Sequence, residues 1–331
     1  MKERDPVFDI MKGFAMLSVI IAHTEAPWLL YHTFLPFRVP LFFAISGYFA
    51  KEWLLFGFLK NGAKRVLIPL AFTSLVMLAI SLALDEIFGT SVLNIAAKSL
   101  VLGGASWPVP LGEVYILSAG PLWFLWATLL VRIYWSFLQR IRKETLRGAI
   151  ILFFAIAAYN SKLYFTLPFS IQASFGALGF FYAGFLIKRY YLLDGENVKK
   201  ILPICFVCLV YITGFSNMDV NLCIYEAYYV IEILGTIAAF FVLYTTIKNS
   251  RSESKFWSLF NFVGRYSIIV LCVHAIDQNM LVYWFPYKIL SAFTGNFQII
   301  CAMMLRIIFA VSLTYLISKN KFLCEKIFFI K

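Results

Sequence analysis

Long runs of hydrophobic residues, separated by short polar segments, recur along the whole chain of 331 residues. Most of these runs approach the ~20 residues that an α-helix needs to cross a bilayer. They do not show the alternation of polar and apolar positions that marks the strands of a membrane β-barrel. The pattern therefore predicts an all-α integral membrane protein with about ten transmembrane helices. The expected spans are roughly 11–30, 36–55, 66–84, 121–138, 148–160, 170–187, 201–215, 225–247, 263–285 and 298–318.

No linker or low-complexity segment divides the chain, so residues 1–331 are expected to form a single polytopic domain. The longest predicted loop covers residues 85–120 and lies on the outer side. Within it, residues 92–102 are apolar but too few to cross a bilayer, so we expect them at the membrane surface or dipping in as a cap. Ser46-Gly47-Tyr48, inside the second span, favours close approach of another helix.

The composition agrees with a membrane protein, because 62% of the residues are hydrophobic and only 14% are charged. The net charge of +12 would suggest nucleic-acid binding in a soluble protein. Here roughly 23 of the 29 basic residues fall in alternate loops, as the positive-inside rule requires of cytoplasmic loops. We therefore expect both termini in the cytoplasm, contacts with membrane lipids, and no nucleic-acid partner.

A polar stripe runs along the first predicted span. Lys12 and His23 are 11 residues apart, which places them on nearly the same face of a helix and about 16 Å apart along its axis. Asp9 lies one turn before Lys12. Because polar groups facing lipid are costly, this stripe should face a cavity or another part of the protein. His23, expected deep in the span, is a candidate general base that removes a proton from a hydroxyl group. The alternative is a histidine that only bonds between helices. No metal-ligand cluster is evident.

Several motifs, in order along the chain, resemble the acyltransferase-3 family of membrane-bound acyltransferases. The closest likeness is to its sugar O-acetyltransferase branch, of the fucose 4-O-acetylase type. The family typically has Arg followed, after ten residues, by His; this chain has Lys12 and His23 in those places. The motifs are FDIMKGFAMLSVIIAHT, RVPLFFAISGYFAKE, FLKNGAKRVLIP, PLWFLWATLL and VGRYSIIVLCVHAID.

The resemblance implies a multi-pass enzyme of the bacterial inner membrane. Such an enzyme moves an acyl group, usually acetyl, from cytoplasmic acyl-CoA to a hydroxyl of a cell-envelope glycan or its lipid-linked precursor. Acetyl-CoA is then a donor substrate, and no tightly bound cofactor is expected. Direct transfer and an acyl-enzyme relay both remain open. A non-catalytic glycan transporter or flippase would also need charges within the membrane, although no internal repeat favours it.

Four cations are candidates for holding the CoA phosphates: Lys60, Lys64 and Arg65 in the inner loop before the third span, and Arg132 in the inner half of the fourth. The three loop residues could instead be topology signals that contact anionic lipids.

Four residues are candidates for the acceptor site, each with an ordinary alternative. Arg38 could pair with an acidic acceptor or with lipid headgroups, and Trp123 could stack on a sugar or sit at the membrane interface. His274 could meet His23 or bond a neighbour. Arg306 could bind a ligand or, like Arg132, form a structural pair with a carboxylate such as Glu232.

Overall fold

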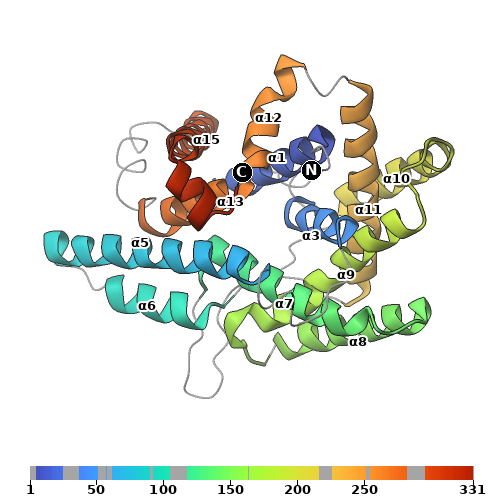
Figure 1. The fold of residues 1–331 in the computed structure, drawn as a ribbon, viewed down its shortest axis with the longest axis horizontal. Coiled ribbons are helices and arrows are strands. Elements are labelled where there is room, and N and C mark those ends of the chain that lie inside the picture. The colour runs from blue at the N-terminus through green and yellow to red at the C-terminus, as the bar shows by residue number, and fades with distance from the viewer. Residues whose placement is uncertain are drawn as a thin grey trace. The chain divides into compact units, whose positions relative to one another are not determined.

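The computed structural model describes residues 5–24, 37–50, 57, 62–89, 92–104, 118–162, 164–215, 226–250, 254–281 and 295–330. Its regular elements are helices (Figure 1), and within those ranges the only β-type pairing is an isolated bridge between Gly104 and Ser118. The predicted all-α class is thus confirmed for the described part of the chain.

The first helix, α1 (Pro6–Ala22), begins and ends earlier than the span expected at 11–30. Its start has a local cause, because the Asp5 carboxylate accepts a hydrogen bond from the Val7 amide at 2.9 Å. Pro6 occupies the first turn, where its missing amide hydrogen costs nothing. His23 follows the last helical residue and caps the helix.

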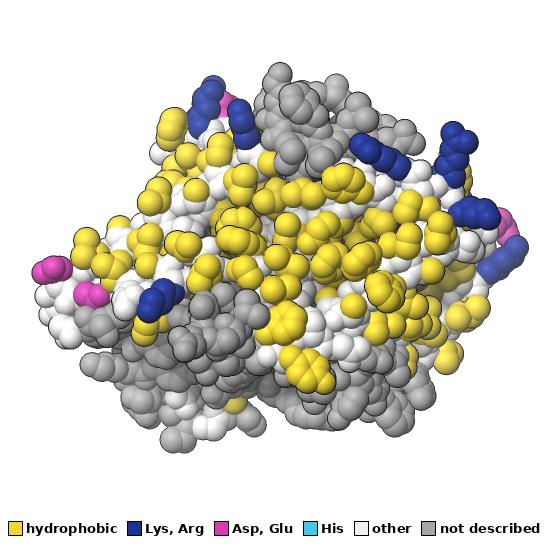
Figure 2. Space-filling model, turned by 90° about the horizontal axis from the view of Figure 1, so that it is seen from below, with side chains coloured by type: hydrophobic (Ala, Val, Ile, Leu, Met, Phe, Trp, Pro, Cys, Tyr) yellow, Lys and Arg dark blue, Asp and Glu magenta, His cyan; other side chains and the backbone are white. Residues whose placement is uncertain are grey.

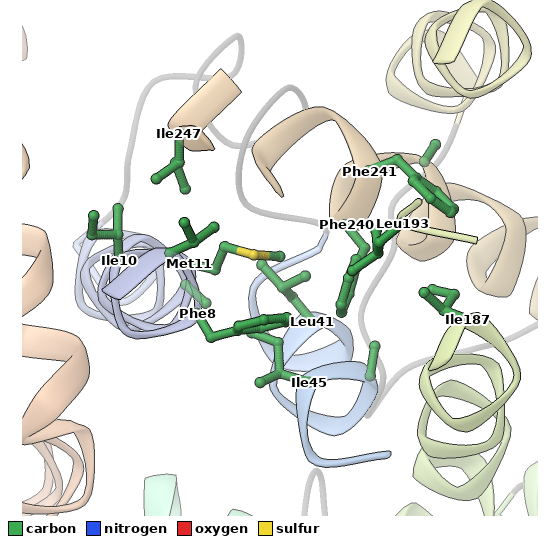
Figure 3. Packing of buried hydrophobic residues seen from close by; sticks show 14 of the residues in the cluster. Phe8, Ile10, Met11, Leu41, Ile45, Ile187, Leu193, Phe240, Phe241 and Ile247 are labelled. Atoms are coloured by element: carbon green, nitrogen blue, oxygen red, sulfur yellow. The ribbon is translucent and has the colours of Figure 1, made fainter. Parts of the chain in front are cut away.

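By its contacts the chain divides into two compact units. The first contains Met1–Lys51 and Ala177–Ser267. It includes α1, α3 (Arg38–Tyr48), α10 (Gly195–Phe215), α11 (Glu226–Asn249), α12 (Lys255–Arg265) and most of α9 (Ile171–Arg189). Its core joins side chains from α1, α3, α9, α10 and α11 and from the segment after α9 (Figure 3). The residues labelled there are Phe8, Ile10, Met11, Leu41, Ile45, Ile187, Leu193, Phe240, Phe241 and Ile247.

Two helix pairs in this unit cross with their backbones almost in contact. A Cβ added to Gly47 of α3 would lie 1.8 Å from the Phe181 carbonyl oxygen of α9. A Cβ on Gly184 of α9 would lie equally close to the Ala44 carbonyl oxygen of α3. The expected close approach at Gly47 is therefore confirmed, and Gly184 is its counterpart on the other helix. A second reciprocal pair joins α1 to α12 through Gly13 and Gly264.

The second unit contains Glu52–Gly176 and Ile268–Lys331. Its helices are α5 (Lys64–Phe88), α6 (Val92–Leu102), α7 (Trp123–Leu138), α8 (Glu144–Lys162), α13 (Ser267–Ile276) and α15 (Gly295–Lys319), with shorter helical turns η2 (Gly120–Leu122), η3 (Pro168–Ser170), η4 (Asp277–Leu281) and η5 (Leu323–Ile327).

Helix α6 occupies the apolar segment that was expected within the outer loop 85–120, and it lies beside α5 (Figure 1). The turn between them contains Gly89, whose φ of +65° is in the left-handed region that glycine adopts readily. The Leu93 amide donates to the Asp85 carboxylate at 2.9 Å across this turn. Part of the predicted loop is thus helical, while residues 90–91 and 105–117 lie outside the described part.

Arg147, one of the basic residues that the sequence assigns to the predicted cytoplasmic loops, is buried with 4% exposure. Its Nε donates to the Leu138 carbonyl oxygen at 3.1 Å, and one terminal nitrogen donates to the carbonyl of Ile141. The guanidinium lies over the Trp135 ring, 5.4 Å from its centroid. Arg147 therefore binds carbonyl groups at the end of α7, where helices leave such acceptors unpaired.

Within the described residues, five helices are long and apolar enough to cross a membrane, or six if the bent pair α12 and α13 forms one span. The expected number of about ten spans is not confirmed. The five are Lys64–Phe88, Gly120–Leu138, Pro168–Arg189, Tyr229–Asn249 and Phe297–Lys319. Large hydrophobic side chains are exposed along several helices, among them Leu75, Phe153 and Ile308. Figure 2 shows hydrophobic side chains spread over the surface in that view, as expected of a protein whose solvent is lipid.

Candidate active site

Two members of the polar stripe predicted on the first span, Asp9 and Lys12, lie in α1 and contact each other. The Lys12 ammonium donates to the Asp9 carboxylate at 3.0 Å. The Asp9 side chain is 5% exposed and that of Lys12 is 25% exposed. Opposite this pair, α12 packs so closely that a Cβ on Gly264 would lie 1.6 Å from the Asp9 carbonyl oxygen. The ion pair is therefore held at the crossing of two helices.

His23 lies in the turn that ends α1, and its side chain is exposed. The expectation that the first helix continues past His23 is therefore wrong, because α1 stops at Ala22. Its Nδ1 is 2.9 Å from the Val19 carbonyl oxygen. A carbonyl oxygen only accepts, so this contact requires a hydrogen on Nδ1. The neutral ring then carries its lone pair on Nε2. The spacing of His23 and Lys12 remains about three helical turns, roughly 16 Å.

A group of cations gathers in the second unit at the start of α5. Lys64 and Arg65 are its first two residues, and both are exposed. Arg132 of α7 is close enough to Arg65 for the two cations to repel each other. The preceding residue, Ala63, supplies no side-chain cap to the amide groups of this helix end. Lys60, the fourth predicted phosphate ligand, lies outside the described residues.

Three buried ionisable side chains meet elsewhere in the second unit. Asp277 Oδ2 is 3.6 Å from Arg306 Nε and 3.8 Å from His274 Nδ1. The three residues are exposed by 4%, 6% and 0%, respectively. Arg306 thus contacts a carboxylate, as one alternative held, and the carboxylate seen here is that of Asp277. Asp277 was not singled out from the sequence, although it is the last residue of the motif that contains His274.

The other predicted acceptor-site residues lie at helix starts. Arg38 is the first residue of α3 and is half-buried. Trp123 is the first residue of α7, is only 7% exposed, and has its ring 6.3 Å from that of Phe124. Within the described residues, no group of three or more His, Cys, Asp or Glu side chains is placed to bind a metal ion.

The predicted residues thus form three groups. Asp9 and Lys12 meet in the first unit. In the second unit, Arg132 lies within electrostatic range of Arg65, and His274 and Arg306 both contact Asp277. Chemically, the exposed imidazole could exchange a proton, the cations at α5 could bind phosphate, and the buried group could hold a polar ligand.

Comparison with known proteins gives a match to a family model. The family model described as "Acyltransferase domain", that of the acyltransferase-3 family, matches residues 5–316. Neither the curated proteins nor the solved structures contain a significant match to the chain.

Proposed function

Because the chain belongs to the acyltransferase-3 family and is a membrane acyltransferase, we propose that it moves an acetyl group from cytoplasmic acetyl-CoA to a hydroxyl of a cell-envelope sugar. The acceptor is a glycan or its lipid-linked precursor, and the enzyme works in the bacterial inner membrane. The sugar O-acetyltransferase branch is proposed because the motifs around Lys12, His23 and Trp123 resemble it. Family membership favours an acyltransferase over the transporter that the sequence left open.

The observation that carries the proposal is the contact between His23 Nδ1 and the Val19 carbonyl oxygen. It orients the imidazole and favours the tautomer whose Nε2 can accept a proton from the acceptor hydroxyl. The position of His23 at the C-terminus of α1 also matters. The negative end of the helix dipole stabilises a cation there by about 0.3–1 kcal/mol, which supports the imidazolium that forms during transfer.

The donor is proposed to bind through its phosphates to Lys64, Arg65 and Arg132, together with Lys60. Cations at the positive end of a helix are unfavourable on their own, and Arg65 and Arg132 repel each other. A polyphosphate relieves both effects, and helix starts bind phosphate readily. In the first unit, Lys12 is proposed as a further charged group of the reaction, and Asp9 positions it. Arg38, Trp123, His274 and Arg306 are proposed for the acceptor side.

The experiment compares His23→Ala and His23→Gln with the wild-type protein in lipid nanodiscs, using acetyl-CoA as donor. Release of CoA thiol and incorporation of labelled acetyl into membrane glycans are measured. Gln can still donate to the Val19 carbonyl but cannot take up a proton. We expect both variants to lose about 10²–10⁴-fold in turnover, with unchanged thermal unfolding.

The matched control is His32→Ala, at a histidine to which the sequence assigns no role; its turnover should equal that of the wild type. Near-normal turnover by purified His23→Ala would show that another group is the base. Absence of CoA release by the wild-type protein would exclude acetyl-CoA as the donor.

A further inference from the structure

The buried group of His274, Asp277 and Arg306 has a geometry that a simple ion pair does not explain. Both of its contacts converge on the same oxygen, Asp277 Oδ2, at 3.6 and 3.8 Å. Both distances exceed the 2.7–3.2 Å of a nitrogen–oxygen hydrogen bond. A polar contact this long raises the question of which group lies between the partners.

Within the described residues, Asp277 Oδ2 is buried and accepts no hydrogen bond. The same is true of Oε1 of Gln278, the next residue along the chain. A buried carboxylate oxygen without a donor costs free energy, about 1–3 kcal/mol or more for a charged group. Buried polar atoms without a hydrogen-bond partner are rare in folded proteins, and a bound water, ion or ligand often supplies the missing partner.

The backbone at this point is also irregular. Asp277–Leu281 is a π-helical turn that follows directly on α13. The Asn279 side-chain amide donates to the Ala275 carbonyl oxygen at 2.8 Å. The same amide packs against Gly120, where an added Cβ would lie only 2.4 Å from the amide nitrogen. Gly120 has a φ of +56° and begins η2, which leads into α7. Irregular helical turns inside membrane proteins are tolerated where protein or a polar cavity surrounds them, and π-turns are frequent at functional sites.

We propose that His274, Asp277 and Arg306 form a hydroxyl-binding site. Asp277 Oδ2 accepts the hydrogen of a hydroxyl, and Arg306 Nε–H or His274 Nδ1–H donates to its oxygen. This arrangement gives the buried carboxylate oxygen a donor. The inference rests on the proposed function in assigning the hydroxyl to the acceptor sugar, since an ordered water offers the same chemistry.

The first test is a structure of the full chain in nanodiscs, at a resolution that shows water, with glycerol as the hydroxyl probe. We expect density for a hydroxyl group or water within hydrogen-bond distance of Asp277 Oδ2. Direct hydrogen bonds from Arg306 and His274 to this oxygen, with no density between them, would overturn the proposal. This test does not depend on any acyl transfer.

The second test separates the acceptor from water. Asp277→Asn removes the negative charge that faces the buried Arg306 guanidinium and should destabilise the protein. Asp277→Asn combined with Arg306→Gln removes both charges and should regain most of that stability. Transfer of label from acetyl-CoA to the glycans of membrane vesicles is measured for each variant, together with acetyl-CoA affinity by calorimetry.

If the site binds the acceptor, the double variant stays about 10- to 100-fold slower in transfer, the effect of a hydrogen bond to a charged group, with unchanged acetyl-CoA affinity. If transfer returns together with stability, the site holds only water and the assignment to the acceptor is wrong. The control is Thr314→Val, which removes a buried side-chain hydroxyl of α15. This variant should transfer acetyl groups at the wild-type rate. A wild-type protein that transfers no label would refute the proposed function. The hydroxyl site would still be decided by the first test, the density near Asp277 Oδ2 in the nanodisc structure.

Discussion

Gly264 of α12 lies so close to Asp9 of α1 that a Cβ at position 264 would be 1.6 Å from the Asp9 carbonyl oxygen. The contact is reciprocal, because a Cβ on Gly13 of α1 would be 1.8 Å from the Phe260 carbonyl oxygen of α12. Since the obstructing atoms belong to backbone on both sides, neither helix can relieve a clash by rotating a side chain. The two glycines therefore set the separation of α1 and α12, and with it the surroundings of the Asp9–Lys12 pair.

Gly264→Ala should force α12 away from α1, lowering the stability of the protein by at least about 1–3 kcal/mol, as overpacking does. Turnover should fall with it, because Asp9 and Lys12 lose their packing. Thermal unfolding and CoA release measure the two effects. Gly195→Ala is the matched control, since nothing lies within 4 Å of a Cβ there. A Gly264→Ala protein with wild-type stability would mean that the two backbones are farther apart than described.

Lys12→Arg should retain turnover, whereas Lys12→Met should lose most of it. The charge opposite Asp9 is kept in the first variant, and the 25% exposure of the Lys12 side chain leaves room for a guanidinium. The second leaves Asp9, which is almost fully buried, without its ammonium partner. Turnover and thermal unfolding of both variants provide the measurement. Equal turnover in the Lys12→Arg and Lys12→Met proteins is the result that would remove Lys12 from the reaction.

Lys64→Ala combined with Arg65→Ala should weaken acetyl-CoA binding by about 10- to 100-fold, the loss expected for charge-assisted hydrogen bonds to phosphate. Calorimetric titration of the purified protein with acetyl-CoA measures the affinity. Lys98→Ala, which removes an exposed cation of α6 in the same unit, is the control. If the double variant binds acetyl-CoA as the wild type does, Lys64 and Arg65 serve only membrane topology.

Arg147→Lys should destabilise the protein by about 2–4 kcal/mol although the charge is retained. A single ammonium cannot reproduce the separate donors that reach the carbonyls of Leu138 and Ile141, so buried acceptors lose their partners. Chemical or thermal unfolding measures the loss. Arg142→Ala, at an exposed arginine of the same turn, should change the stability by less than about 0.5 kcal/mol. Similar stabilities of the two variants would contradict the capping role of Arg147.

The sequence was most informative where a local physical rule decides the structure. The apolar segment 92–102 coincides with α6, and Gly47 lies at a close helix crossing. Hydropathy alone predicts too late a start for α1, which begins at Pro6. The local signal was present in Asp5-Pro6, a helix cap followed by a proline suited to the first turn.

Other features depend on contacts between distant segments and could not be read from periodicity. The charge of Arg306 demands a partner within the membrane, but nothing in the sequence points to Asp277 as one. Arg147 resembles its exposed neighbours, yet the end of α7 folds around it. The span expected at 263–285 is interrupted at Tyr266, between α12 and α13. No proline stands there, so the sequence gives no signal that the helix breaks at this point.

The crossing of α1 and α12 also constrains the order in which the protein can be built. Helix α1 packs against a helix that ends at Arg265, so the whole intervening segment must be synthesised before α1 finds this partner. During that interval α1 carries two charged side chains. Because Asp9 and Lys12 are three residues apart on the same helix, they can neutralise each other without waiting for α12. The nascent helix can thus enter the membrane with its charges already matched, and α12 later docks against a pair that is complete.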